Sequence, residues 1–306
     1  MGLSILIPVY NYDVTVLVNT LSRQLNQTGI AAEIVLLDDG SQTSFDHINQ
    51  PLSQIPFVKY SRNAVNAGRT VTRKLLAKAA QFDYLLFLDC DSTIIHDDFI
   101  KIYYEKVESN ALLVSGGRIY NSDIPDICNY RLHWKYGSRR ESGMGKKKNG
   151  PAFMSHNFLV KKTLFLQLDF TKQLKGYGHE DSLWGIQFRQ MGVIMKQVNN
   201  PVLHASLEET GIYLIKTEQA LGNLLMLQSM VHEEYLIKEI KIYKWYKRLC
   251  SIGLAGVFSI MERPFHSKIR ANLESCNPSL FLFDLYRLAV LIRISGKKNS
   301  ISGNSD

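Results

Sequence analysis

The sequence predicts an α/β fold with a mostly parallel central sheet, followed by a C-terminal helical extension. Over about the first two-thirds of the chain, short apolar runs alternate with stretches of helical periodicity. This alternation is typical of parallel strands joined by crossover helices. The runs, such as Tyr84–Leu88, are continuously apolar, as expected of strands covered on both faces. From about Thr210 onward only helical patterns remain.

The expected strands and helices follow one another along the chain. Strands are predicted at Leu3–Val9, Glu33–Leu37, Phe57–Tyr60, Tyr84–Leu88, Ala111–Gly116, Phe153–Val160 and Val193–Val198. Helices are predicted at Val14–Gln27, Arg69–Gln81 and Asp97–Glu108, and then at Leu214–Leu227, Val231–Leu249, Leu254–Met261 and Leu280–Ile294. We expect a first domain over residues 1–205 and the extension over 206–306. Residues 121–150 lack periodicity and predict a mobile loop over a site, and the tail Ser295–Asp306 is expected to be disordered.

Composition excludes several classes of protein. With 45% hydrophobic and 21% charged residues, the chain is not globally disordered, and no fixed-period repeat suggests a solenoid or propeller. Cys90, Cys128, Cys250 and Cys276 form no CxxC pair, which argues against a zinc ribbon or a disulfide framework and favours a reducing compartment. No basic segment or cleavage site precedes the first strand, so we expect no secretory signal and a cytoplasmic protein.

The net charge of +8 is unevenly distributed. The basic residues gather at Arg139, Arg140 and Lys146–Lys148, at Lys238–Arg248, and at Lys297 and Lys298. On charge alone such patches suit nucleic acid, anionic lipid or phosphorylated substrates. The sequence has no nucleic-acid-binding signature, so a nucleic-acid partner is not expected.

Asp89 and Asp91 directly follow the apolar run Tyr84–Leu88. Carboxylates at the carboxyl end of a strand can project into the crevice where open α/β sheets bind ligands. There they suit Mg²⁺ or Mn²⁺ shared with a diphosphate. The alternative is a pair of solvated turn aspartates.

Two earlier strands also end in polar turns. Pro8, Val9, Tyr10 and Asn11 end the first strand, and Asp39 follows the second. An acidic residue at the end of the second strand can accept hydrogen bonds from a ribose or base. Alternatively, Asp39-Gly40 is only a tight turn. No G-x-G-x-x-G lies near the first turn, which speaks against a nicotinamide site.

Three further groups of residues can have either a catalytic or binding role or only a structural one. Glu180 and Asp181 open a helix, where carboxylates favour the positive end of the dipole, but one of them could be a general base. His204 follows an apolar strand and can be a core residue or a metal ligand beside carboxylates. Arg69 and Arg73 share one helix face, where they can meet a phosphate or point into solvent.

Together and in this order, these segments resemble the family 2 glycosyltransferases, which have the Rossmann-like GT-A fold. The resemblance covers about residues 3–205. Pro8, Val9, Tyr10 and Asn11 match the family's nucleotide-binding start, and Asp39 matches its base- and ribose-contacting aspartate. Asn66, Gly68 and Arg73 match its N-x-G-x-x-x-x-R stretch, and Asp89 and Asp91 match its D-x-D. The resemblance implies a donor half over about 1–118 and an acceptor half over about 119–205.

The segment from Phe153 to Asp181 is similar to the acceptor side of the galactosyltransferase and chondroitin-polymerase-like branch. That resemblance implies that Asp181 is the general base, that Glu180 positions the acceptor hydroxyl, and that His204 joins Asp91 in holding Mn²⁺ or Mg²⁺. Asp89 would contact the ribose or the donor sugar. The chain departs from the pattern at Phe170-Thr171, where the branch often has an acidic pair, and at Lys74, where many members have asparagine.

The activity that the resemblance implies is inverting transfer of a sugar from a nucleotide-sugar, by family habit a UDP-sugar, to a hydroxyl group. The acceptor would be a saccharide or a lipid-linked saccharide of a bacterial surface-polysaccharide pathway. Two other functions stay open. A catalytically silent nucleotide-sugar or glycan-binding subunit would not need the carboxylates of Asp91 and Asp181, and a nucleotidyltransferase would need a Gly-rich, basic start in place of Pro8–Asn11.

The extension has the composition of a membrane-surface helix group. Leu249–Met261 is too short an apolar stretch to span a bilayer core of about 30 Å. Lys241, Lys244, Lys247 and Arg248 are interleaved with Tyr243, Trp245 and Tyr246. We therefore expect peripheral contact with an anionic membrane surface. Alternatively, these helices pack on the first domain or on another subunit of a homo-oligomer.

Overall fold

The computed structural model describes residues 2–142, 153–170, 174, 176–204 and 206–302. The chain forms two compact units, each with its own hydrophobic core. Unit 1 comprises Met1–Asn121, Glu141–Gln173 and Gln187–Ser206, and unit 2 comprises Ser122–Arg140, Leu174–Ile186 and Leu207–Asp306. The predicted domains 1–205 and 206–306 stay a prediction.

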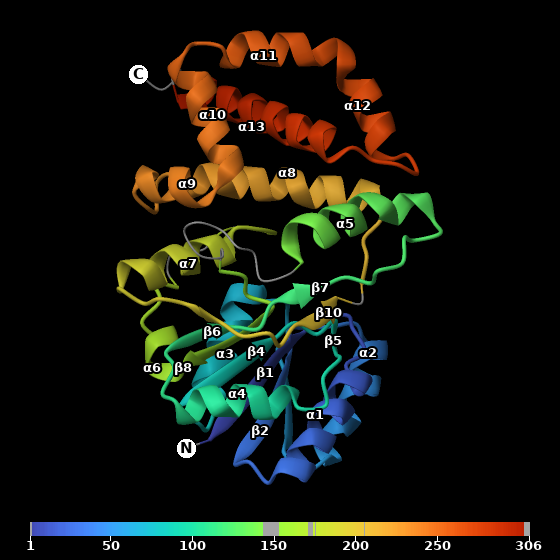
Figure 1. Ribbon diagram of the computed structural model, residues 1–306, viewed down its shortest axis with the longest axis vertical. Helices are drawn as coiled ribbons and strands as arrows, with labels where there is room; N and C mark the ends of the chain where they lie inside the picture. Colours follow the sequence, from blue (N-terminus) through green and yellow to red (C-terminus); the bar gives the residue numbers. More distant parts are fainter. Residues whose placement is uncertain (1, 143–152, 171–173, 175, 205, 303–306) are drawn as a thin grey trace. The chain divides into compact units, whose positions relative to one another are not determined.

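Unit 1 is built on a seven-stranded sheet with the order β3-β2-β1-β4-β8-β6-β9 (Figure 1). The strands are β1 (Leu3–Val9), β2 (Ala32–Asp38), β3 (Val58–Arg62), β4 (Tyr84–Leu88), β6 (Leu113–Ser115), β8 (Asn157–Lys161) and β9 (Lys196–Gln197). The pairs β1–β2, β2–β3, β1–β4 and β6–β9 are parallel, and β8 is antiparallel to both of its neighbours. The prediction of an α/β fold with a mostly parallel sheet is confirmed.

The continuous apolar runs reflect a sheet that is buried on both faces. Alternate strand residues such as Ile5 and Leu86 share one core with helices α1 (Thr15–Thr28) and α4 (Phe99–Glu108). On the opposite face, Phe87 stacks on Phe158 with ring centroids 4.9 Å apart. The other helices of this unit are α2 (Thr43–Asn49), the 3-10 turn η1 (Gln50–Gln54), α3 (Arg69–Ala79) and α6 (Lys162–Phe165).

A second, three-stranded sheet in unit 1 was not expected from the sequence. It contains β5 (Ser92–Ile94), β10 (Val202–His204) and β7 (Arg118–Ile119), in the order β5-β10-β7. In this sheet His204 lies opposite Ser92, and Val202 lies opposite Arg118. The sheet thereby joins the residues after β4 to a strand far away in the sequence.

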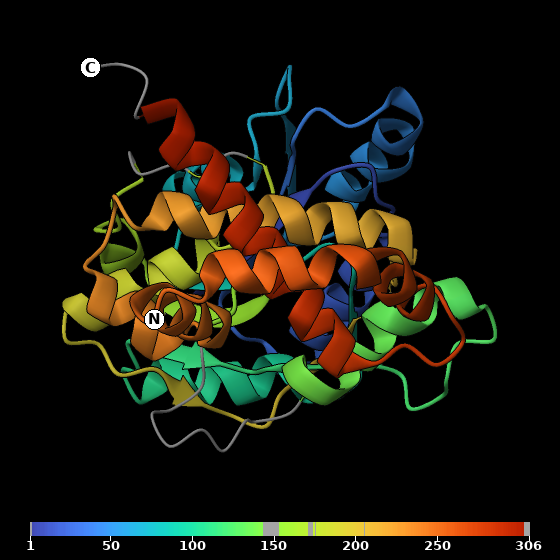
Figure 2. The same cartoon turned by 90° about the horizontal axis from the view of Figure 1, so that it is seen from above.

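Unit 2 is helical, as the sequence predicts for the extension. Its helices are α8 (Thr210–Leu227), α9 (Glu233–Glu239), α10 (Lys241–Ser251), α11 (Ala255–Glu262), α12 (His266–Leu273) and α13 (Leu280–Ser302), with η2 (Cys128–Tyr130), α5 (Arg131–Tyr136) and η4 (Arg263–Phe265). Helix α7 (Glu180–Gln190) begins in this unit, and α13 lies across α8 (Figure 2). Within the described ranges, no helix combines the length and apolarity needed to cross a membrane.

Two expectations of disorder are wrong over much of their range. Residues 128–141 form η2, α5 and the π-helical turn Gly137–Glu141, because Leu132 is fully buried in the core of unit 2. Residues 143–150, including Lys146–Lys148, lie outside the described residues. Helix α13 continues through the predicted tail to Ser302, since adding a residue to an existing helix is easier than nucleating one. Residues 303–306 also lie outside the described part.

Two further expectations about the extension are corrected. The helix predicted at Val231–Leu249 is interrupted at Ile240, whose backbone is extended between α9 and α10. Cys128 and Cys276 form a disulfide across a sequence separation of 148 residues, which corrects the argument from the missing CxxC pair against disulfides. Pairing over such a distance depends on the tertiary fold, and it removes the argument for a reducing compartment.

Candidate functional site

The predicted donor residues lie at one edge of the main sheet in unit 1. Strand β1 pairs in parallel with both β2 and β4, so the carboxyl ends of all three strands meet at this edge. The chain winds outward from β1 to β3 and then returns to β4 on the other side of β1. Ligands of open α/β sheets bind at such a switch point.

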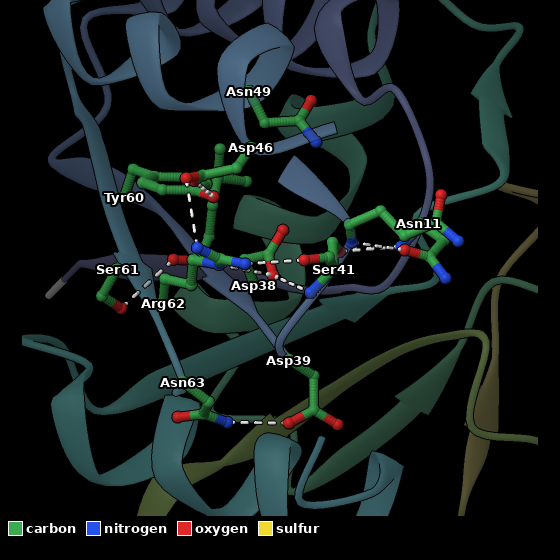
Figure 3. Close-up of polar contacts among 12 residues, drawn as sticks. Asn11, Asp38, Asp39, Ser41, Asp46, Asn49, Tyr60, Ser61, Arg62 and Asn63 are labelled. Carbon is green, nitrogen blue, oxygen red and sulfur yellow. Dashed lines mark hydrogen bonds and ion pairs between the residues drawn. The ribbon is translucent and has the colours of Figure 1, made fainter. Parts of the chain in front are cut away.

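Asp39 holds the loop that precedes α3. Its Oδ1 accepts hydrogen bonds from Asn63 Nδ2 at 2.8 Å and Ala67 N at 2.9 Å, and its Oδ2 accepts one from Gly68 N at 2.9 Å. Figure 3 shows the bond from Asn63. Gly40 is needed beside it, because its φ is +77° and a Cβ there would lie 2.8 Å from Asn66 N. The tight turn is therefore present, and Asp39 also orders the loop before α3.

The turn after β1 is tied to the turn after β2. Asn11 N donates to Ser41 Oγ at 2.8 Å, and Asn11 Oδ1 accepts from Gln42 N at 2.8 Å (Figure 3). The side chain of Val9 lies in the core, so only its backbone can face a ligand. Tyr10, by contrast, is half exposed, and its ring is available to a planar base.

Asp89 and Asp91 lie in opposite electrostatic environments. Arg73 is buried and donates from Nη2 to Asp89 Oδ1 at 2.5 Å, while Arg118 Nη2 lies 4.0 Å from Oδ2. Burial alone would raise the pKa of Asp89, but the Arg73, Arg69 and Arg118 guanidinium groups outweigh it and lower that pKa. Burial and the adjacent Asp89 carboxylate raise the pKa of Asp91 to about 6. Asp89 is thus held as a carboxylate, whereas ionised Asp91 is costly without a further cation.

His204 supplies the second group beside Asp91. Its Nδ1 lies 3.2 Å from Asp91 Oδ2, because β10 pairs with β5 directly after the D-x-D segment. A carboxylate oxygen and an imidazole nitrogen at this separation fit the donor set of Mn²⁺. Across the described residues, no group of three or more His, Cys, Asp or Glu side chains is placed to hold a metal ion. Asp91 and His204 alone leave coordination positions that the oxygens of a diphosphate or water suit.

Arg118, Tyr120, Glu141 and His156 surround this pair and were not singled out from the sequence. Tyr120 OH donates to Glu141 Oε2 at 2.5 Å, and the Tyr120 ring meets the His204 ring edge-on at 5.2 Å. Arg118 Nη1 donates to Tyr120 OH at 3.1 Å. Burial and the Arg118 charge hold the pKa of His156 well below its usual range, so this imidazole is neutral. Arg118 lies in the two-residue strand β7, which gives no periodic signal, and His156 directly precedes β8.

The Gly-rich turn before Asp181 belongs to unit 2 and is fastened to α8. Asn223 Nδ2 donates to the carbonyl oxygens of Tyr177 and Gly178, both at 3.1 Å. A Cβ at Gly178 would lie 2.4 Å from the Cβ of Ala220, so only glycine fits there. Asp181 Oδ1 accepts from Ser182 N at 2.7 Å at the start of α7. The extension therefore holds the turn that carries the predicted base.

The same turn has an unusual backbone at its centre. His179 has a φ of +66°, and its Nδ1 lies 3.1 Å from Ser182 Oγ. Burial and the Arg287 charge lower the pKa of His179 to about 4, so the ring is neutral near pH 7. Strained positions of this kind persist where the surroundings hold them firmly. Whether Asp181 faces Asp91 and His204 stays a prediction.

The two departures from the family pattern contact each other. The Lys74 Nζ lies 4.9 Å from the centroid of the Phe170 ring. Phe170 is buried, so this cation–π contact takes place where water is largely excluded. The two departures thus belong to one contact, which joins α3 to the segment after α6. Thr171 lies outside the described residues.

We expect Arg73→Met to destabilise unit 1 strongly. Removing the buried Arg73 leaves the Asp89 carboxylate without its direct partner, with only the weaker charges of Arg118 and Arg69 nearby, which costs about 3 kcal/mol in the free energy of unfolding. Urea denaturation measures the loss, and Arg73→Met/Asp89→Leu should recover part of it. Arg23→Gln, which removes an exposed pair with Asp97, is the control and should change nothing measurable. A loss no larger than that of the control would contradict the role assigned to Arg73.

Comparison with known proteins points to one family. The family described as glycosyl transferase family 2 matches residues 4–168. An uncharacterized glycosyltransferase of Haemophilus influenzae is 32% identical over 115 residues, which cover 37% of this chain and 46% of that protein. Glycosyltransferase GlyG of Streptococcus pneumoniae is 27% identical over 182 residues, covering 55% and 60%. The chondroitin synthase of Escherichia coli is 24% identical over 237 residues, covering 66% and 34%.

These relatives are longer than the matched part, and the chain spans about half the length of the first two. Among solved structures, a mycobacterial protein has a TM-score of 0.50 at 13% identity, covering 73% of each chain. Glucosyl-3-phosphoglycerate synthase of Mycobacterium tuberculosis, solved with Mn²⁺, UDP and glucosyl-3-phosphoglycerate, has a TM-score of 0.49 at 14% identity, covering 74% of this chain and 79% of that one.

Proposed function

Because the chain belongs to glycosyl transferase family 2, we propose that it moves a sugar from a nucleotide-sugar to a hydroxyl group of an acceptor. The donor is a UDP-sugar, and the acceptor is a saccharide or a lipid-linked saccharide. The observation that best supports this proposal is the pairing of Asp91 with His204 at 3.2 Å, beside an Asp89 held by Arg73. Two possible metal ligands and one fixed carboxylate, gathered where β4 and β10 end, suit a sugar diphosphate.

The reaction is a single displacement with inversion. The acceptor oxygen attacks the anomeric carbon while its proton passes to the Asp181 carboxylate. The bond from that carbon to the diphosphate oxygen breaks on the opposite side, and the nucleoside diphosphate leaves with the electron pair. A base is needed because a sugar hydroxyl is a poor nucleophile until its proton is removed. Glu180, next to Asp181, positions the hydroxyl.

At the donor end, this chain's own residues bind and orient. Asp39 shapes the loop against the base and ribose, and Asp89 accepts hydrogen bonds from the ribose or the sugar. Asp91 and His204 would hold Mn²⁺ or Mg²⁺, which supplies positive charge to the departing diphosphate. Arg118 keeps Asp89 and Glu141 in place through its contacts with both carboxylates.

Thermal unfolding of the full chain with UDP-, GDP- and dTDP-sugars, with and without Mn²⁺, tests the donor. We expect the UDP-sugars to raise the melting temperature, and more so with Mn²⁺, because ligands that bind the folded state stabilise it. Release of UDP on addition of a saccharide acceptor then tests transfer. Donor binding without UDP release or sugar transfer would favour a silent nucleotide-sugar-binding subunit. Release of pyrophosphate from a nucleoside triphosphate would favour a nucleotidyltransferase.

Asn223→Leu is expected to lower kcat by about 10-fold or more while the KM for the donor stays unchanged. The substitution removes the two hydrogen bonds that hold the Gly-rich turn, and a small displacement of a catalytic group is costly. Leu224→Ala, one residue later in α8, is the control: it removes core packing and not the turn contacts. An equal fall of kcat in both variants would show that Asn223 acts only through stability.

A further inference from the structure

Unit 2 exposes large apolar side chains along one continuous stretch of chain. Six of them lie between residues 245 and 265, each 46–67% exposed: Trp245, Ile252, Leu254, Val257, Ile260 and Phe265. Single exposed apolar residues are normal on a protein surface, but a concentration of them marks a contact surface. We call these six residues the α10–α11 surface.

The inward and outward sides of α11 are both apolar. Ala255 and Phe258 pack against the core of unit 2, and α11 contacts α13. Leu254, Val257 and Ile260 recur every three residues and form a separate exposed stripe. Because α11 also exposes apolar side chains on its solvent side, we expect a binding partner to cover that side.

The outward side of α10 is basic and aromatic. Lys241, Lys244, Trp245 and Arg248 have the spacing of one helix face and are exposed, whereas Tyr243 and Tyr246 face inward. The Arg248 guanidinium lies 5.5 Å from the centre of the Trp245 ring.

The charges on this side are available to a partner. Lys241, Lys244 and Arg248 form no ion pair with any other described residue. Lys247, on the inner side of the same helix, is by contrast paired with Glu233 at 2.8 Å. Basic side chains and a tryptophan on one helix, followed by an aliphatic stripe on the next helix, which contacts it, are the combination that suits the boundary between lipid headgroups and acyl chains.

We propose that the α10–α11 surface binds an anionic lipid bilayer: Leu254, Val257 and Ile260 enter the acyl boundary, and Lys241, Lys244 and Arg248 contact the headgroup phosphates. A second copy of the chain is a poorer occupant, because two-fold pairing would bring the basic residues close to their own copies. Single-stranded nucleic acid would use Trp245 but not the aliphatic stripe. The proposal goes beyond sugar transfer and is tested independently of it.

Flotation of the full chain with vesicles tests the proposal. We expect the protein to float with vesicles of phosphatidylcholine and phosphatidylglycerol, and far less with phosphatidylcholine alone. Val257→Ser/Ile260→Ser should lose most of the binding to both, because the apolar stripe is removed. Lys244→Gln/Arg248→Gln should bind anionic and neutral vesicles equally. Added salt should have the same effect on the unchanged protein, because it screens the attraction between charges.

Matched controls lie in unit 1. Val16→Ser/Ile194→Ser removes exposed apolar residues, and Lys78→Gln/Lys101→Gln removes exposed charges, so both should float like the unchanged protein. Circular dichroism melting confirms that each variant is folded. The proposal is overturned if the unchanged protein does not float, or if the controls lose as much binding as the surface variants. It is also overturned if Val257→Ser/Ile260→Ser only turns a dimer into a monomer in sedimentation.

Discussion

Asp181→Asn is expected to reduce sugar transfer by about 10²–10⁴-fold while donor binding stays within about twofold, because general base catalysis contributes that much to the rate. The amide has nearly the shape of the carboxylate but cannot take the acceptor proton. It can also keep the hydrogen bond that Asp181 Oδ1 accepts from Ser182 N. The measurements are kcat with saturating donor and acceptor, and the donor dissociation constant by calorimetry.

The control addresses the simpler explanation that Asp181 only favours the start of a helix. Glu234 lies in the first turn of α9, as Asp181 does in α7, and is exposed. Glu234→Gln should therefore leave transfer unchanged, because only the helix dipole term is lost. If Asp181→Asn lowers donor binding as much as transfer, its role as the base is wrong.

Asp91→Asn is expected to abolish transfer and, without metal, to stabilise the folded protein. Burial and the Asp89 carboxylate raise the pKa of Asp91 from 3.8 to about 6. The protonated carboxyl group therefore contributes stability that is fully present below pH 3.8 and is lost as the pH rises through about 6. Above that pH the ionised group is a cost, and the asparagine, which does not ionise, should be more stable by about 3 kcal/mol.

Thermal unfolding between pH 4 and pH 8, with and without Mn²⁺, measures this difference. The advantage of the variant should vanish toward pH 4, and Mn²⁺ should stabilise only the protein that keeps Asp91, because a cation offsets the buried charge. If Mn²⁺ stabilises the Asp91→Asn variant as much as the unchanged protein, the metal does not bind at Asp91 and His204. His204→Ala is the complementary variant, expected to lose the Mn²⁺ response while Asp91 stays in place.

The strands of the main sheet were predictable because each is a continuous apolar run. Tyr84–Leu88 has the predicted bounds, and β1 likewise spans Leu3–Val9. The second sheet was not predictable, since strands of two or three residues such as Arg118–Ile119 have no period to detect. Arg118 was missed for the same reason. Arg118 lies near Asp89 because β7 pairs with β10, whereas His156 lies beside Asp89 because β8 pairs with β4.

By itself, the sequence was sufficient for the order of strands and helices, the burial of the sheet on both faces and the family, because these depend on local periodicity and on motifs of adjacent residues. The tertiary structure decided which distant residues meet. It paired His204 with Asp91, Arg73 with Asp89, Asn223 with the Gly-rich turn, and Cys128 with Cys276. The physical reason is that such contacts depend on strand pairing and helix packing, whose registers involve residues far apart in the chain.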